Sequence, residues 1–288
     1  MLFSCIPINR TVFHAISSTT KRNGLIYSRR FISNTKQLMN NAAKTEENRT
    51  QQLDPRHLGI AQEVYIPTQW SNMPSIFLHP IVYAKSIVRR IYTLGMNTIQ
   101  VALFRYQSGL KPNFVLWKNS AIETYINVNK AFAKKDIMSI KPSVSIWVEE
   151  TLKERAKQLP KNAVLDWELK KFNEVPKLIT VQALMIPGRP LEYLQIVYKF
   201  NTKQRLIKFN KESGKTDTLD RDVIDYTGFL IDANTNDVIL LGTVFESKPD
   251  AKLPQNNDNV NIAIKNMKIN GDIYRLPQPI GTMDSKKK

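Results

Sequence analysis

Apolar side chains first recur with a helical period between residues 80 and 94. Pro80 suits the first turn of a helix and Gly95 suits its end, and the apolar positions between them lie three or four residues apart, at Ile81, Ala84, Val88 and Ile91. This spacing predicts an amphipathic helix over residues 80–94. Ile87 and Leu94 add apolar side chains on other sides of the same helix, so a helix packed partly on a sheet is the alternative.

Two further helices are predicted before residue 160. Ser120 followed by Glu123 forms a capping-box pattern, which predicts a helix to about Lys134 with apolar positions at Ile122, Tyr125, Ile126 and Phe132. A third helix is expected from Pro142 to about Gln158, with a buried stripe formed by Val144, Trp147, Val148 and Leu152.

Beyond Pro160 the pattern changes to β-rich runs separated by Asn, Gly, Asp and Pro. The runs cover residues 164–172, 178–186, 191–201, 205–210, 223–232 and 238–246. Helices first and antiparallel strands second predict an α+β domain in which the amino-terminal helices pack on one face of a curved antiparallel sheet. This domain is expected to span residues 54–277.

Charge distinguishes the amino terminus from this domain. The chain has 42 Lys and Arg against 25 Asp and Glu, and the formal net charge of +17 favours polyanionic partners such as RNA or anionic lipid. Residues 1–45 contain no acidic residue, which is typical of a mitochondrial transit peptide. The run from Arg29 to Ser33 resembles a matrix-peptidase site, so residues 1–33 are predicted to be a cleaved presequence. The alternative is a basic tail that binds nucleic acid.

The segments on either side of the predicted domain are polar. Residues 34–53 contain few aromatic side chains and are predicted to form a flexible linker. Residues 278–288 end in three consecutive lysines and are predicted to form a disordered basic tail.

A second acid-free window, from Val64 to Ile122, surrounds the helix predicted at residues 80–94. No stretch of it approaches 18 uninterrupted apolar residues, so no membrane-spanning helix is predicted. Basic and apolar side chains on one helix instead suit the surface of an anionic membrane. The predicted membrane-binding residues are Ile81, Lys85, Val88, Arg89, Arg90 and Tyr92, with the basic side chains directed toward lipid headgroups.

Basic residues also alternate with aromatic ones in a pattern that can stack bases and neutralise phosphates. The pattern occurs at residues 104–106, 117–118 and 198–200, although in a strand it fits equally a sheet with one buried face. From Lys199 to Lys215, six basic residues face one acidic residue, Glu212, across a predicted hairpin. Such a basic ribbon suits an RNA or ribosome surface.

The predicted ribosome- or rRNA-binding residues are therefore Arg105, Lys111, Lys118, Lys199, Lys203, Arg205, Lys208 and Lys211. The alternative for the hairpin is that its lysines only form a solvated edge, because lysines on edge strands prevent aggregation.

Residue types that support catalysis are sparse. Cys5 lies in the predicted presequence, so no disulfide or thiol chemistry is expected in the mature chain, and His57 and His79 are too far apart for a zinc motif. The glycines occur singly, which argues against a phosphate-binding loop. The cluster of Asp220, Asp222 and Asp225 surrounds Arg221 and favours a turn with an ion pair over a metal site. We predict no catalytic, cofactor-binding or metal-binding residues.

Whole phrases of the chain resemble the fungal mitochondrial inner-membrane ribosome receptors, which work beside the Oxa-type insertase. The phrases are residues 54–59, 101–105, 117–119, 123–129, 165–167, 202–208, 219–223, 245–249 and 270–277. That family is similar to a mitoribosomal large-subunit protein near the exit tunnel and to the membrane-proximal domain of a presequence-translocase subunit. Both of these have a cystatin-like α+β fold, which the resemblance implies here.

The resemblance implies a peripheral protein on the matrix side of the inner membrane. It would tether the large mitoribosomal subunit near the exit tunnel and promote co-translational insertion of mitochondrially encoded proteins. The implied partners are large-subunit rRNA and proteins, anionic lipid and the Oxa-type insertase as a functional partner, with no cofactor and no small-molecule substrate. A constitutive structural protein of the mitoribosome is the main alternative, and an enzyme on the same fold is the other.

Overall fold

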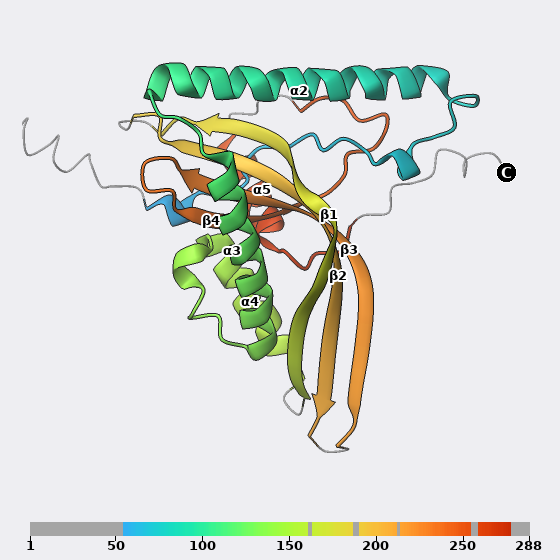
Figure 1. Cartoon of the computed structure of the whole chain (residues 1–288), viewed down its shortest axis with the longest axis vertical. Helices are drawn as coiled ribbons and strands as arrows, with labels where there is room; N and C mark the ends of the chain where they lie inside the picture. Colours follow the sequence, from blue (N-terminus) through green and yellow to red (C-terminus); the bar gives the residue numbers. More distant parts are fainter. Residues whose placement is uncertain (1–53, 161–162, 187–189, 212–213, 255–258, 278–288) are drawn as a thin grey trace, which may run out of the picture. The chain divides into compact units, whose positions relative to one another are not determined.

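The computed structural model describes residues 54–160, 163–186, 190–211, 214–254 and 259–277. The predicted presequence, linker and carboxyl-terminal tail lie outside these residues. The described part holds four α-helices and a four-stranded sheet (Figure 1), which confirms the α+β class; the cystatin-like assignment stays a prediction. The elements are α2 (Pro80–Ser108), α3 (Phe114–Lys134), α4 (Ile146–Gln158), β1 (Ala163–Leu184), β2 (Tyr193–Asn210), β3 (Thr216–Asp232), β4 (Val238–Val244) and α5 (Val260–Gly271), with 3-10 turns at Pro55–His57, Trp70–Asn72 and Lys141–Ser143.

The four strands follow one another in the order β1-β2-β3-β4, and every neighbouring pair is antiparallel. The runs predicted at residues 164–172 and 178–186 are one strand, β1, which crosses Pro176. Register shifts between Leu169 and Thr180 accommodate the proline, because a bulge tolerates the missing N–H and bends the strand.

The runs predicted at 191–201 and 205–210 also form one strand, β2. The residues between them are polar yet buried: Thr202 is fully buried and Gln204 is 5% exposed. The Gln204 amide donates to the hydroxyls of Tyr125 (2.8 Å) and Thr202 (2.9 Å) and accepts from the Trp167 indole at 3.0 Å. Because these polar groups satisfy one another, the strand continues through them.

Both faces are covered in the half of the sheet that contains β4. On one face, α3 and α4 pack over the alternating side chains Leu194, Ile196, Tyr198 and Phe200 of β2. On the other face, the amino-terminal segment inserts Ile60 and Ile66 among Val197, Leu230 and Leu241. Two side-chain amides of α5, from Asn266 and Asn270, hold this segment by donating to its backbone carbonyls at 2.9 and 3.0 Å.

Helix boundaries differ from the predictions at three points. Helix α2 continues past Gly95 to Ser108 and ends at Gly109, whose φ of 70° is the left-handed conformation typical of a helix end. Helix α3 begins at Phe114 rather than near Ser120, because Asn113 caps it by accepting from the Leu116 N–H at 3.2 Å. Helix α4 is capped by Ser145, and Pro142 lies in the preceding 3-10 turn.

Helix α2 lies beside the outer edge of β1 (Figure 1). The Asn97 side chain donates to the Ile179 carbonyl at 2.8 Å and accepts from the Val181 N–H at 3.0 Å, and Gln100 accepts from the Ala183 N–H at 3.2 Å. These side chains replace the missing neighbouring strand, so the helix protects the edge from pairing with another chain.

Candidate functional site

The solvent-facing side of α2 carries large apolar side chains along its whole length. Six side chains at helical spacing form what we call the α2 stripe: Ile81, Val88, Tyr92, Ile99, Leu103 and Tyr106. Each is at least 45% exposed, from Leu103 at that value to Tyr106 at 88%. With a rise of 1.5 Å per residue the stripe is about 38 Å long. An apolar surface of this extent marks a site of interaction with a membrane or another protein.

The opposite side of α2, which faces the protein, carries both polar and apolar side chains. Ser86 is fully buried, and Asn97 and Gln100 contact β1 as described above, while Phe104 is fully buried in the hydrophobic core. The helix differs from an ordinary surface helix in that its exposed side also carries large apolar side chains. Of the predicted membrane-binding residues, Ile81, Val88 and Tyr92 belong to the stripe, and Lys85 is exposed in the same row.

Arg89 and Arg90 do not point outward with these residues, contrary to the prediction that they face lipid headgroups. The Arg89 guanidinium donates to the Pro249 carbonyl at 2.9 Å. Arg90 donates to the Thr68 carbonyl, and its guanidinium stacks over the Trp70 ring at 4.0 Å. Buried backbone carbonyls need donors, so both arginines hold surrounding loops in place.

The apolar surface continues into the segment before α2, where Phe77 is 93% exposed and Leu78 is 67% exposed. No α-helix in the described part of the chain is long and apolar enough to span a membrane.

The basic residues of β2 lie on an inner strand. The predicted hairpin is one strand from Lys199 to Asn210, and the chain turns only between β2 and β3. Because β2 pairs with β1 on one side and β3 on the other, the solvated-edge alternative is wrong. Lys199, Lys203 and Arg205 are half-buried.

Aspartates of β3 neutralise part of this charge. Arg205 forms a bidentate ion pair with Asp220, at 2.6 and 2.7 Å, and Lys203 lies opposite Asp222 in the ladder. The Arg205 guanidinium holds the pKa of Asp220 below its usual range. The aspartates thus lie on a strand rather than in the predicted turn, and Asp220 pairs with Arg205 of β2 rather than with Arg221, the cation within the cluster.

Two other groups of predicted ribosome-binding cations are more accessible. Lys208 and Lys211 are exposed beside the β2–β3 turn, together with Lys215. Arg105, Lys111 and Lys118 lie where α2 leads into α3, with the first two exposed and Lys118 half-buried. The structure therefore divides the predicted ribosome-binding residues between the turn, the inner strand and the α2–α3 junction.

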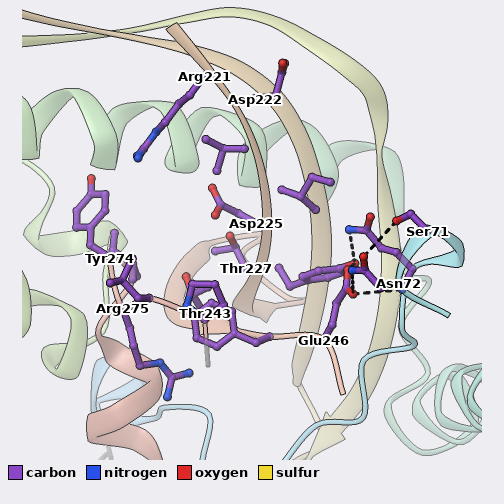
Figure 2. A pocket seen from close by; sticks show the side chains of 18 of the residues that line it. Ser71, Asn72, Arg221, Asp222, Asp225, Thr227, Thr243, Glu246, Tyr274 and Arg275 are labelled. Carbon is purple, nitrogen blue, oxygen red and sulfur yellow. Dashed lines mark hydrogen bonds between the residues drawn. The ribbon is translucent and has the colours of Figure 1, made fainter. Parts of the chain in front are cut away.

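A cavity of about 1240 Å³ opens between β3, α3 and the carboxyl-terminal segment around Tyr274. Figure 2 shows Asp225, Thr227 and Thr243 pointing into it, with Glu246 on one wall. The Glu246 carboxylate accepts from the Tyr226 hydroxyl at 2.8 Å and from the Asn72 amide at 3.0 Å.

Asp225 is joined to the buried polar network of β2. The Tyr125 hydroxyl donates to its carboxylate at 2.6 Å. Burial raises the pKa of Asp225, although the hydrogen bond from Tyr125 opposes the shift. Burial, together with the nearby Asp225 charge, also raises the pKa of Tyr125. The Tyr125 ring also stacks on the core residue Phe200, with ring centroids 4.6 Å apart. We therefore interpret the buried pair of Tyr125 and Asp225 as part of the structural core.

The cavity and the carboxyl-terminal half of the α2 stripe were not predicted from the sequence. Ile99, Leu103 and Tyr106 continue the spacing that begins at Ile81, and that signal was present in the sequence. For the buried polar network, the signal in the sequence is a polar residue, such as Gln204 or Asp225, at a strand position whose side chain points toward the core.

Comparison with known proteins gives two matches. The sequence model of the MBA1-like protein family matches residues 44–279. The chain is also 57% identical, over 254 residues, to the inner membrane mitoribosome receptor MBA1, mitochondrial, of Saccharomyces cerevisiae; the alignment covers 86% of this chain and 91% of that protein. The chain therefore belongs to the MBA1-like protein family.

Proposed function

We propose that this chain is a mitochondrial receptor that holds the large ribosomal subunit, near its exit tunnel, against the matrix side of the inner membrane. The name of the yeast relative, an inner membrane mitoribosome receptor, supports both partners. The observation that supports contact with the membrane is helix α2, whose exposed side carries the six large apolar side chains of the α2 stripe. Such a helix lies in a membrane interface with its apolar side toward the acyl chains.

Binding to the ribosome is assigned to the accessible basic side chains. Lys208 and Lys211 beside the β2–β3 turn, and Arg105 and Lys111 at the α2–α3 junction, are exposed and able to neutralise backbone phosphates. We expect the inner-strand cations to contribute less, because Arg205 is already paired with Asp220.

A role in membrane insertion is part of the same proposal. A ribosome held with its exit near the bilayer delivers the emerging chain to an insertase of the Oxa type, which we propose as the functional partner. The receptor itself performs binding and no catalysis, in keeping with the name of the yeast relative.

A constitutive subunit of the mitoribosome is the alternative, and fractionation distinguishes the two. A receptor should remain partly with membranes after washing with high salt and puromycin, because the α2 stripe holds it by apolar contact that salt does not weaken. Complete recovery in the ribosomal fraction would instead identify a structural subunit.

Targeting is a separate part of the proposal. Residues 1–33 should act as a presequence that the matrix peptidase removes. Amino-terminal sequencing of the protein from mitochondria should find a start near residues 30–34. A mature chain that still begins at Met1 or Leu2 would refute cleavage.

A further inference from the structure

The outer edge of β3 has no strand partner over more than half of its length. Strand β3 begins at Thr216, and β2 pairs with it throughout, but β4 pairs with it only from Tyr226 to Ile231. Within the part of the chain that the structure describes, no strand pairs with the outer side of residues 216–225, which we call the β3 edge. Its first seven residues are exposed.

The direction of the backbone groups on the β3 edge follows from the ladder. The Asp232 N–H points away from β2, since it donates to the Asp237 carbonyl across the β3–β4 turn at 3.0 Å. Backbone groups alternate along an antiparallel strand, and the β2–β3 register runs without a shift. Asp220, Asp222 and Ile224 therefore direct their N–H and carbonyl groups outward, to where a further strand would lie.

The β3 edge is also acidic for this protein. It carries Asp217, Asp220, Asp222 and Asp225 against the single cation Arg221, whereas the whole chain has a net charge of +17. Asp220 is paired with Arg205 and Asp225 accepts from Tyr125, so the exposed carboxylates of Asp217 and Asp222 are the ones that disfavour RNA phosphates. If two copies of the chain paired through this edge, their aspartates would repel one another. Charged side chains on edge strands commonly prevent such edge-to-edge pairing.

We propose that the β3 edge binds an extended, lysine- and arginine-rich polypeptide segment of a large-subunit ribosomal protein, which adds to the sheet as a further strand. Backbone hydrogen bonds supply affinity in this mode of recognition, and side-chain contacts supply selectivity. Here the aspartates select a basic segment. This inference rests on the proposed function, because it takes the ribosome as the source of the segment.

The cavity lies at the inner end of the β3 edge. Asp222 and Ile224 belong both to the edge and to the cavity wall. Beyond them, the buried residues Thr227 and Thr243 point into the cavity (Figure 2). An added strand would therefore continue into a space lined by hydroxyl groups.

Site-specific photo-crosslinking tests the proposal directly. A benzoyl-phenylalanine placed at the exposed position Thr218 of the full chain would be irradiated on purified large mitoribosomal subunits. We expect a crosslink to a basic segment of a ribosomal protein, sensitive to protease and resistant to ribonuclease. Crosslinks only to rRNA or to a second copy of this chain, or none while the chain still co-sediments, would overturn the inference. Failure to co-sediment would instead count against the proposed function.

A matched pair of variants tests the backbone contribution. Thr218 directs its N–H outward, so Thr218→Pro removes a donor that the fold does not use, whereas Thr218→Val keeps it. We expect Thr218→Pro to bind large subunits about tenfold more weakly than Thr218→Val. Equal affinities with equal thermal unfolding midpoints would refute strand addition. If the proline variant fails to fold, Asp217→Lys replaces it, and undiminished ribosome binding by that variant would refute selection by charge.

Discussion

Glu149 connects the amino-terminal segment to helix α4. Its carboxylate contacts Arg56 at 2.5 Å and Lys153 at 2.6 Å, and its side chain is only 9% exposed. Burial alone would raise its pKa, but the hydrogen bonds from Lys153 and Arg56 outweigh burial and lower it. The ionised form of Glu149 therefore stabilises the folded state.

We predict that Glu149→Gln lowers the free energy of unfolding by about 1–3 kcal/mol at pH 7, because it leaves Arg56 without its counter-charge. Since the folded-state pKa is depressed, this contribution is present above the unfolded pKa of about 4.3 and is lost as the pH falls through the folded value. The free energies of urea unfolding of the variant and wild type should thus converge as the pH falls through the folded-state pKa.

The control for this change is Glu150→Gln on the same helix, where the side chain is exposed. It should change the free energy of unfolding by less than about 0.5 kcal/mol. A loss at Glu150 equal to that at Glu149 would show that helix charge, and not the ion pair, is responsible.

Gly242 marks a close contact between β4 and α5. Its φ is 143°, and a Cβ added there would lie 2.0 Å from the Asn270 carbonyl oxygen. We predict that Gly242→Ala lowers the free energy of unfolding by about 3 kcal/mol or more. Gly95→Ala is the contrasting change: a Cβ meets nothing within 4 Å, and alanine should stabilise the helix by about 0.5–1 kcal/mol. Equal effects in thermal unfolding would contradict this account.

At the scale of elements, the sequence predicts the type of most elements better than their boundaries, but it did not predict helix α5, whose Asn266 and Asn270 contact the distant amino-terminal segment. Helix α2 was expected to end at Gly95, because glycine often follows a helix, but this glycine lies on the open side of the helix and interrupts nothing. Strand β2 was expected to break at residues 202–204, because three polar residues interrupt its apolar alternation. The hydrogen bonds that bury Gln204 come from α3 and β1, so local sequence alone could not reveal them.

For the candidate surfaces as well, some residues were placed correctly from the sequence and others were not. Ile81, Lys85, Val88 and Tyr92 were found on the exposed side of α2 from spacing alone. Arg89 and Arg90 were misplaced, since their partners, Pro249 and Thr68, belong to distant segments. The ion pair between Arg205 and Asp220 depends on strand pairing, and only the register of β2 against β3 reveals it.

For helix α2, we predict that Val88→Asp with Tyr92→Asp abolishes binding to liposomes that contain anionic lipid. Both side chains are more than half exposed, so the fold should tolerate the change, while the apolar contact with the acyl chains is lost. Liposome flotation measures it. Thr98→Asp, also exposed on α2 but outside the stripe, is the control, and equal losses in both variants would argue against the stripe as the contact.

For the β2–β3 turn, we predict that Lys208→Glu with Lys211→Glu weakens binding to the large subunit. The slope of log affinity against log salt should also fall by about 2, one for each lost phosphate contact. Arg205→Gln, whose guanidinium is paired with Asp220, should change the slope less. Co-sedimentation over a salt series measures both the affinity and the slope. An unchanged slope in the double variant would place the rRNA contact elsewhere, and the α2–α3 junction would be the next candidate.

Across the whole described domain, the α2 stripe and the cations of the β2–β3 turn lie at different ends of β2. Helix α2 contacts β1 at residues 179–183, of which residues 180–183 pair with residues 194–197 of β2, whereas Lys208 and Lys211 follow at the other end of that strand (Figure 1). The sixteen residues from Gln195 to Asn210 measure about 50 Å along an extended strand. That separation lets one molecule contact a bilayer through α2 and a ribosome through the β2–β3 turn at once.

The most direct test of this account is a three-component flotation experiment with purified large mitoribosomal subunits, anionic liposomes and the mature chain. We predict that the chain carries the subunits to the top of the gradient, that Val88→Asp with Tyr92→Asp leaves both the chain and the subunits at the bottom, and that Lys208→Glu with Lys211→Glu floats the chain while most subunits remain below. Subunits that float equally well without the chain, or with both double variants, would contradict the tethering role.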